Sequence, residues 1–260
     1  MSILAEERKK IILELLRSRG QVKVLSLAQK LSVSEETVRR DLDILEKDGL
    51  LRRVYGGAVP HKFASFEPPY LQRQSYRADE KKRIGQRAAS LVKSGDTIAI
   101  DVGTTTLEFA RAIADLQRLT ILTNSLAVAF TLMESLNAGR FAGKVILIGG
   151  ELNPQQQSLS GVAGERMMKQ FSVDKAFLSV GGVTLERGIS DYDINESSMS
   201  TAFAEAAGEV IVLADESKMG KDSFVTIMPI EPVHMIVSSS PPPEDWLPYL
   251  QNCRIKWIEA

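Results

Sequence analysis

Seven short apolar runs, rich in β-branched residues, recur through the second part of this 260-residue sequence, and helical stretches separate them. The runs are TIAID at 97–101, TILT at 120–123, KVILIG at 144–149, KAFLSV at 175–180, EVIVLA at 209–214, HMIVSS at 234–239 and RIKWI at 254–258. Runs this apolar are typical of parallel strands that helices cover on both faces. The sequence therefore predicts an α/β domain with a Rossmann-like, mostly parallel sheet over residues 80–260.

The first 58 residues show helical periodicity instead. Apolar stripes are formed by Ile11, Ile12, Leu15 and Leu16, then by Leu27, Ala28 and Leu31, and then by Val38, Leu42 and Leu45. Each stripe lies on one face of a helix, so the three helices are expected to pack together. The Gly56-Gly57 pair that follows can supply the positive φ of a tight hairpin. Three helices and a two-stranded ribbon predict a winged helix-turn-helix at 1–58.

Residues 59–79 fit neither pattern. They contain Pro68-Pro69 and few periodic apolar residues, which is typical of a connector. We predict a linker at 59–79 between the two domains.

Composition excludes several classes of protein. No apolar run approaches the ~18 residues of a membrane span, and the N-terminal segment is acidic where a signal peptide would not be, so a cytoplasmic protein without a membrane partner is expected. The sequence has a single cysteine, Cys253, and two distant histidines, His61 and His234. We therefore expect no intramolecular disulfide, no metal site and no cofactor.

The polar face of the third predicted helix fits a DNA-binding surface. Ser34 is its natural N-cap, Thr37 and Arg39 flank the apolar stripe, and Arg40 lies opposite the stripe. A recognition helix touches bases and phosphates from such positions. Arg52, Arg53 and Tyr55 lie on the predicted wing, and the two arginines there would follow the phosphate backbone.

The charge distribution agrees only weakly with this surface. Residues 1–60 hold 12 basic and 9 acidic residues, a net +3, and the remainder holds 20 and 24, a net −4. A solvated surface helix is an alternative, because Glu36–Arg40, Arg39–Asp43 and Asp43–Lys47 are opposite charges four residues apart.

Polar residues also follow the predicted strands. They are Asp101, Gly103, Thr104, Thr105 and Thr106 after the first strand, Thr123 and Asn124 after the second, Gly149 and Gly150 after the third, and Lys218 after 209–214. Ends of parallel strands meet at one edge, so we expect these residues to converge on a ligand. Backbone N–H groups, hydroxyls and one lysine favour a phosphate on a small polyol, with Asp101 taking sugar hydroxyls. The alternatives are a plain N-cap for the threonines and a surface position for Lys218.

Two sets of motifs resemble a known family. RKKIILEL at 8–15 and SEETVRRDLDILEKDGLLRRVYGGA at 34–58 resemble the DNA-binding signature of DeoR/GlpR-type bacterial transcription regulators. DVGTTT, LTNSLAVA, LIGGEL, AFLSVGGV and LADESKMG then occur in the order of that family's C-terminal sensor. The resemblance covers nearly the whole chain.

The resemblance implies a sensor similar to ribose-5-phosphate isomerase and CoA transferases, which responds to phosphorylated sugars or their breakdown products. It also implies a role for Glu196, which aligns with a glutamate that many members keep. Ser200 and Thr201 stand where members commonly have a Lys-Arg pair. The loss of two phosphate-pairing charges leaves a phosphodiester-linked sugar or an opine-like conjugate open beside a sugar monophosphate.

These inferences predict a transcriptional repressor that a phosphorylated sugar or sugar-phosphodiester effector releases from double-stranded operator DNA. A homo-oligomer, either a dimer or a tetramer, is expected because one winged helix makes few base contacts. One alternative is a sugar-phosphate isomerase with an appended N-terminal domain, in which Glu196 or Asp101 would be the base. Another is an adaptor whose winged helix binds protein.

Overall fold

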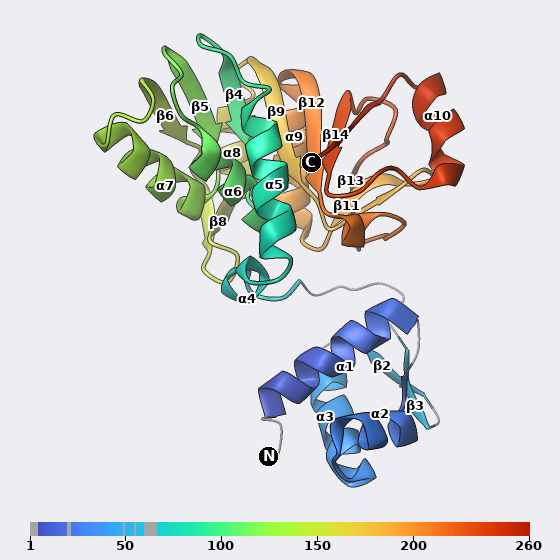
Figure 1. The fold of residues 1–260 in the computed structure, drawn as a ribbon. Coiled ribbons are helices and arrows are strands. Elements are labelled where there is room, and N and C mark those ends of the chain that lie inside the picture. Colours follow the sequence, from blue (N-terminus) through green and yellow to red (C-terminus); the bar gives the residue numbers. More distant parts are fainter. Residues whose placement is uncertain (1–4, 20–21, 49, 55, 60–66) are drawn as a thin grey trace. The chain divides into compact units, whose positions relative to one another are not determined.

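The structure is a computed structural model that describes residues 5–19, 22–48, 50–54, 56–59 and 67–260. The chain forms two compact units, Met1–Glu67 and Pro68–Ala260 (Figure 1). Each unit has its own apolar core.

The first unit is a winged helix-turn-helix, as predicted. Its elements are α1 (Ala5–Arg19), β1 (Val22–Lys23), α2 (Val24–Leu31), α3 (Glu35–Lys47), β2 (Arg52–Val54) and β3 (Gly57–Val59). The predicted two-stranded ribbon is confirmed as the antiparallel pair of β2 and β3, and β1, which the sequence did not predict, pairs with β3 to make a three-stranded sheet of order β1-β3-β2. Val38, Leu42 and Leu45 are buried, so the predicted apolar face of α3 is confirmed.

Gly56 and Gly57 have different purposes in the wing. Gly56 has φ +77°, a backbone conformation that residues other than glycine rarely adopt. A Cβ atom on Gly57 would lie 2.0 Å from the carbonyl oxygen of Val22. Glycine at 57 therefore lets β3 approach β1.

A buried ion pair joins α1 to α3. Arg8 donates from Nε to Oδ2 of Asp41 at 2.8 Å and from Nη2 to Oδ1 at 3.1 Å. The Asp41 hydrogen bond raises the pKa of Arg8 above its ordinary value, although burial opposes the rise. Two parallel N–H···O bonds fix both distance and angle between the helices.

The second unit is built on a seven-stranded sheet, and all seven predicted strands are confirmed. They are β4 (Thr97–Ile100), β5 (Leu119–Thr123), β6 (Gly143–Leu147), β9 (Val173–Ser179), β12 (Ala207–Ala214), β14 (Met235–Ser238) and β15 (Lys256–Glu259). The order is β15-β14-β12-β9-β4-β5-β6, and every neighbouring pair is parallel.

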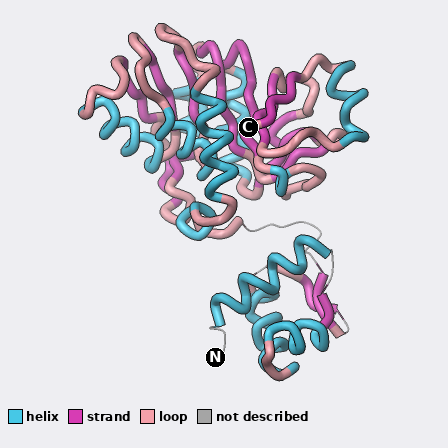
Figure 2. The backbone as a smooth tube through the Cα atoms, in the orientation of Figure 1, coloured by secondary structure: helices cyan, strands magenta, loops and turns pink. Residues whose placement is uncertain are grey.

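Helices cover both faces of this sheet (Figure 2). They are α5 (Ala78–Ala89), α6 (Thr104–Ala112), α7 (Leu126–Asn137), α8 (Val162–Met168), α9 (Ile194–Glu205) and α10 (Leu247–Asn252). In β4, Ile98 and Ile100 enter the core with α5, α6 and α7, whereas Ala99 enters the core with α8 and α9. This two-sided burial explains why the strands are apolar throughout. No helix in the described part of the chain is long and apolar enough to span a membrane.

The second unit also contains elements that the sequence did not predict. They are α4 (Tyr70–Gln74), the hairpin of β7 (Glu151–Asn153) and β8 (Ser158–Ser160), the antiparallel sheet of β10 (Gly182–Thr184), β11 (Gly188–Asp191) and β13 (Val225–Met228), and the 3-10 turns η1 (Glu216–Lys218) and η2 (Glu244–Trp246). Residues 68–79 lie in this unit and not in a linker, because Tyr70 is fully buried in its core.

Asp41→Ala should destabilise the first unit by about 3 kcal/mol, because it leaves the Arg8 guanidinium buried without its carboxylate. Urea unfolding of the full chain, followed by hydrogen exchange of peptides from α1–α3, measures the loss. Glu35→Ala breaks an exposed ion pair with Arg39 and should cost less than about 0.5 kcal/mol. A loss for Asp41→Ala no larger than the control would contradict the role assigned to the pair.

Candidate DNA-binding surface and effector site

The start of α3 has the geometry expected of a capped recognition helix. The Ser34 hydroxyl accepts a hydrogen bond from the backbone N–H of Thr37 at 3.1 Å and lies 2.9 Å from the Thr37 hydroxyl. The predicted N-cap is therefore confirmed. Glu35 and Glu36 occupy the first turn, where negative charge is favourable.

Arg39 and Arg40 lie on the exposed side of α3. Arg39 pairs with Glu35 at 3.0 Å and Arg40 with Glu36 at 3.5 Å, and their side chains are 50% and 77% exposed. The predicted pair Glu36–Arg40 is confirmed, whereas Arg39 pairs one turn back and not with Asp43. Ion pairs this exposed contribute only about 0–1 kcal/mol. Each guanidinium can therefore exchange its carboxylate for a phosphate or a base at little cost.

The two wing arginines differ from each other. Arg52 is exposed, but Arg53 is half-buried and forms an ion pair with Asp43 on α3. The backbone N–H of Arg53 also donates to Glu46 at 2.6 Å. Arg53 thus fastens the wing to α3, a role that the sequence did not indicate. Tyr55, the remaining predicted contact, lies outside the described residues.

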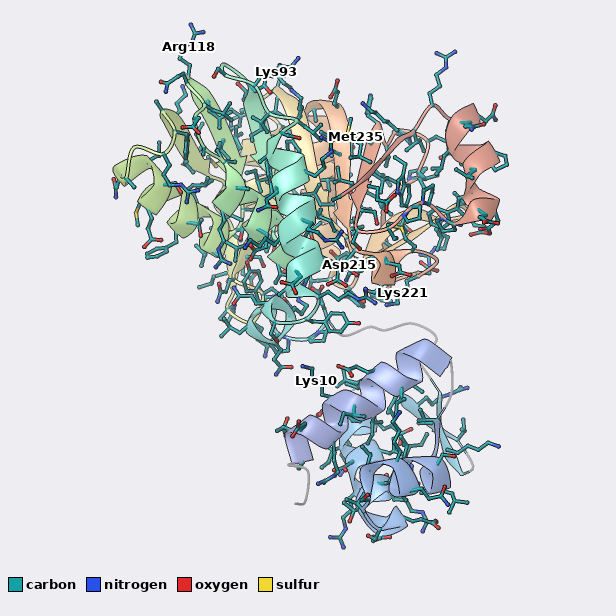
Figure 3. The ribbon with its side chains drawn as sticks, in the orientation of Figure 1. Lys10, Lys93, Arg118, Asp215, Lys221 and Met235 are labelled. Atoms are coloured by element: carbon teal, nitrogen blue, oxygen red, sulfur yellow. The ribbon has the colours of Figure 1, made fainter. Side chains whose placement is uncertain are left out.

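The predicted effector loops share one edge of the sheet. Figure 3 places Lys93 and Arg118, which precede β4 and β5, at one end of the sheet, and Asp215 and Lys221, which follow β12, at the other. Because β4, β5, β6 and β12 all run parallel, the loops after them lie at the second end. Asn124 follows β5, which is next to β4, the strand that Asp101 follows. Lys218 follows β12, which β9 separates from β4, so Lys218 lies farther from Asp101 along this edge.

Asp101 is a buried carboxylate at this edge. Its Oδ1 accepts from the Val102 N–H at 2.8 Å, and its Oδ2 accepts from the Ser200 hydroxyl at 2.6 Å. Burial raises the pKa of Asp101 to about 7 and the Glu196 carboxylate adds to the rise, although the hydrogen bonds from Ser200 and Val102 oppose it. Perturbed carboxyl groups of this kind are concentrated at functional sites.

Glu196 lies one helical turn before Ser200 on α9 and is also buried. Its Oε1 accepts hydrogen bonds from the Ser158 hydroxyl and, at 3.4 Å, from Asn153. The β7–β8 hairpin therefore holds Glu196 near Asp101. The sequence pointed to Ser200 only as a missing charge, but its spacing of four from Glu196 could have placed it on the same buried face.

Asn124 is the most informative of the predicted residues. It is fully buried, and within the described chain neither its Oδ1 nor its Nδ2 has a hydrogen-bond partner. The backbone carbonyl oxygen of Asn124 accepts a hydrogen bond from the Leu159 N–H at 2.8 Å, which places Asn124 beside the hairpin that holds Glu196. A buried amide without partners is costly, so a ligand that supplies partners would gain affinity there. The adjacent Thr123 instead uses its hydroxyl to accept from the Ser125 N–H.

The other predicted residues have local as well as functional explanations. Thr104 and Thr105 begin α6, and the Thr106 hydroxyl donates to the carbonyl of Gly103 at 3.0 Å, which is a local bond within the first turn of the helix. A Cβ on Gly103 would lie 2.3 Å from the Ser179 hydroxyl, and a Cβ on Gly150 would lie 2.3 Å from the carbonyl of Ser160. Both glycines are thus required by close packing. A Cβ on Gly149 would meet no atom within 4 Å, so packing does not require glycine there.

Lys218 ends the 3-10 turn after β12 and lies 6.0 Å above the ring of Tyr192. Its positive charge also lowers the pKa of Asp215. Burial alone would raise the pKa of Asp215, but Lys218, the hydrogen bonds of Ser217 and Lys81 together hold that pKa below its ordinary value. Of the described residues, no group of three or more His, Cys, Asp or Glu side chains could hold a metal ion.

Comparison with known proteins agrees with both units. A family model of the DeoR-like helix-turn-helix domain matches residues 8–62, and one of the DeoR C terminal sensor domain matches residues 76–240. The chain belongs to the DeoR family. It is 35% identical to the transcriptional repressor AccR of Agrobacterium fabrum, over 90% of each chain. It is 31% identical to the glycerol-3-phosphate regulon repressor of Escherichia coli, over 96% of this chain and 97% of the relative.

Among solved structures, the DeoR-family chain is similar to ribose 5-phosphate isomerase A of Methanocaldococcus jannaschii, with 19% identity over 55% of this chain and 54% of that one and a TM-score of 0.40. The resemblance to the DeoR family, predicted from the motifs, is confirmed by the two family models and by the two repressors. Because the relatives are named as repressors and not as enzymes, the isomerase alternative is set aside.

Asp101 should make the stability of the protein depend on pH. Its pKa is about 7 in the folded chain, against an ordinary value of 3.8, so the folded state holds the proton more tightly. The free energy of unfolding should then fall as pH rises toward 7 and level off above it. Between pH 5 and 8 the protein should lose roughly 3 kcal/mol relative to Asp101→Asn, which cannot ionise.

Urea unfolding across this range measures the difference. Asp115→Asn, which removes an exposed carboxylate, should follow the unmodified protein. Parallel curves for Asp101→Asn and the unmodified chain would contradict the assignment.

Proposed function

We propose that this DeoR-family chain represses a carbohydrate-related operon. It binds double-stranded operator DNA as a homo-oligomer in the cytoplasm, through α3 and the wing. A phosphorylated sugar or sugar-phosphodiester, bound at the carboxyl edge of the parallel sheet, releases it from the operator.

The burial of Val38, Leu42 and Leu45 is the observation that carries the DNA-binding part of the proposal. Because this face of α3 is packed inward, Arg39 and Arg40 project outward from the same helix. Arginines so placed can fork onto guanine or phosphate. Arg52 adds an exposed charge on the wing, where it would neutralise a phosphate.

Asn124 carries the effector part. Its buried amide offers one acceptor and two hydrogen-bond donors, which suit hydroxyl groups of a polyol. Asp101 lies at the end of the adjacent strand and can accept from further hydroxyls. Lys218 supplies positive charge at the same edge. One relative is named for the glycerol-3-phosphate regulon, which is consistent with a phosphorylated polyol.

The structure gives a reason to keep both effector classes. The Ser200 hydroxyl is bonded to Asp101, and the Thr201 hydroxyl donates toward the carbonyls of Ser197 and Ile227, both at 2.9 Å. Neither residue adds positive charge. A phosphodiester carries one negative charge fewer than a phosphomonoester, so a sugar phosphodiester fits a less cationic site.

A homo-oligomer follows from the small size of one winged helix, since paired half-sites double the base contacts. To weaken operator binding 100-fold, the effector needs about 2.7 kcal/mol of differential affinity between the two states.

Arg39→Ala with Arg40→Ala should weaken operator binding at least 100-fold, because two contacts to bases or phosphates are lost. The measurement is fluorescence anisotropy with DNA that the protein selects from a random pool. Arg166→Ala with Lys169→Ala removes the same charge from an exposed part of the second unit and should bind normally. If the α3 variant binds DNA like the control, or if no DNA is selected, the adaptor alternative is favoured.

A thermal-shift screen of glycerol 3-phosphate, glucose 6-phosphate and glycerophosphoinositol tests the effector class. A tight ligand must raise the midpoint of unfolding by mass action. The shift should disappear in Asn124→Ala and in Lys218→Ala. It should persist in Lys93→Ala, which removes a lysine from the opposite edge (Figure 3). A shift that is insensitive to both site variants would place the ligand elsewhere.

A further inference from the structure

The corner between α4 and α5, residues 68–81, contacts the loop that follows β4. Tyr70 in this α4–α5 corner is fully buried, and its hydroxyl donates to the carbonyl of Gly103 at 3.3 Å. Gly103 precedes α6 in the loop that begins with Asp101. The first contact of the corner is therefore with the loop that carries the buried carboxylate.

The corner also holds the turn between β7 and β8. The backbone N–H of Tyr70 donates to the carbonyl of Gln155 at 2.9 Å, and Arg73 donates to the side-chain oxygen of Gln156 at 2.6 Å. This hairpin continues to Ser158, which donates to Glu196. A movement of the hairpin at the site would thus be transmitted to α4 through these hydrogen bonds.

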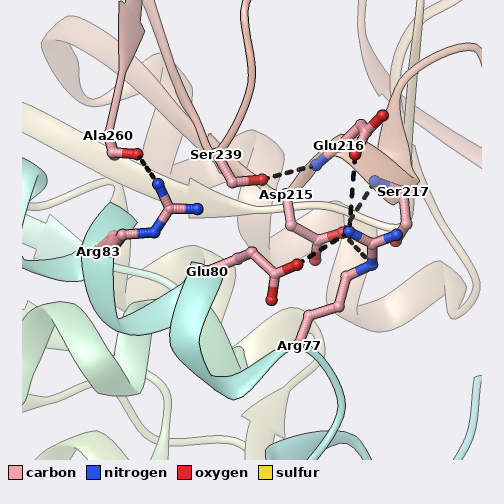
Figure 4. Close-up of polar contacts among 8 residues, drawn as sticks. All are labelled: Arg77, Glu80, Arg83, Asp215, Glu216, Ser217, Ser239 and Ala260. Atoms are coloured by element: carbon pink, nitrogen blue, oxygen red, sulfur yellow. Dashed lines mark hydrogen bonds and ion pairs between the residues drawn. The ribbon is translucent and has the colours of Figure 1, made fainter.

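A third contact reaches the loop after β12. Figure 4 shows the Arg77 guanidinium between Glu80 on α5 and the acidic pair Asp215 and Glu216. The distances are 3.1 Å to Glu80 and 3.8 Å to each of the other two carboxylates. Lys218 follows in the same turn and acts on Asp215. An anion drawn to Lys218 would weaken its attraction to Asp215 and change the balance of charge at Arg77.

The corner itself is tied together. Lys81 is buried, and its ammonium group donates to the carbonyl of Arg73 at 2.6 Å, which joins the end of α4 to α5. Arg77 adopts φ +51° between the two helices. The loops therefore act on a corner whose two helices are linked.

Sequence connectivity gives the corner its further importance. α4 is the first element of the second unit, and residues 60–69 separate it from β3 of the winged helix. The chain that leaves the DNA-binding unit thus enters the second unit at the corner that contacts three effector loops.

We infer that the α4–α5 corner transmits occupancy of the effector site to the DNA-binding unit, and that Tyr70 and Arg77 are its positioning residues. The inference rests on the proposed function. It goes beyond that function by naming the element through which the two binding events affect each other.

The test uses Tyr70→Phe with Arg77→Gln in the full chain. Phe keeps the buried ring, and the Gly103 carbonyl retains donors in the Thr106 hydroxyl at 3.0 Å and the Leu107 N–H at 3.1 Å, so folding should survive. The matched control is Tyr249→Phe with Arg140→Gln. It makes the same chemical changes where Tyr249 bonds Glu231 and where Arg140, which precedes β6 at the opposite edge of the sheet, donates to the carbonyl of Arg111.

Hydrogen exchange with and without operator DNA, selected by the protein from a random pool, needs no effector. Coupling is reciprocal, so operator binding should change exchange in peptides covering 68–81 and 101–107. In the double variant the change at 101–107 should be lost, while operator affinity stays within about 3-fold of the unmodified protein. A purely structural role would lower operator affinity itself.

Glucose 6-phosphate and glycerophosphoinositol serve as probes in a second arm. Any probe that weakens operator binding of the unmodified protein should change that of the double variant less than about 3-fold, although it still binds. The control variant should keep the full effect. Unchanged exchange at 68–81 in the unmodified protein, or full transmission by the double variant, would overturn the inference. Failure to select any DNA would instead contradict the proposed function.

Discussion

Parallel pairing of the seven strands is the constraint on which the second unit depends. Each strand must be followed by a connection that returns the chain to the opposite edge before the next strand begins. The carboxyl ends of β4, β5, β6 and β12 therefore lie at one edge although they are far apart in sequence. This is why Asp101 and Asn124 follow adjacent strands at one edge, and why the loop with Asp215 and Lys218 lies along the same edge. Without parallel pairing, the polar residues after each strand would be unrelated caps.

Burial has the corresponding role in the winged helix. The apolar face of α3 fixes the rotation of the helix about its axis, and the Arg8–Asp41 pair fixes its orientation relative to α1. A buried ion pair contributes little net stability, since desolvation offsets much of the attraction, but breaking it is expensive. Its geometric demand is what matters here. Asp41 lies on the same buried face of α3 as Val38, Leu42 and Leu45, so with this face fixed the direction in which Arg39 and Arg40 project is a consequence of the fold.

The sequence predicted those features whose causes are local or periodic. Two-sided burial produces a continuous apolar run, so all seven parallel strands were recognisable, and a helix face repeats, so Val38, Leu42 and Leu45 were recognisable too. The strands that the sequence did not predict are short or polar, and their antiparallel pairing depends on tertiary neighbours. They are β1, β7, β8, β10, β11 and β13. Pro68-Pro69 suggested a linker, but the second unit begins at Pro68 because the side chain of Tyr70 is buried in its core. Pairs such as Arg53–Asp43, ten residues apart, and Ser200–Asp101, 99 residues apart, leave no periodic signal.

The charges along the carboxyl edge bear on how the proposed effector would lie. Two buried carboxyl groups, Asp101 and Glu196, gather at β4 and the start of α9, and Ser200 and Ser158 donate to them. Positive charge is supplied farther along, where Lys218 and Arg77 face Asp215. A phosphate beside the two carboxylates would be repelled, whereas hydroxyl groups would donate to them. The proposed function therefore orients the effector with its hydroxyls toward β4 and its anionic group toward β12. That orientation puts the anion next to the ion pairs of Arg77, where the α4–α5 corner meets the sheet.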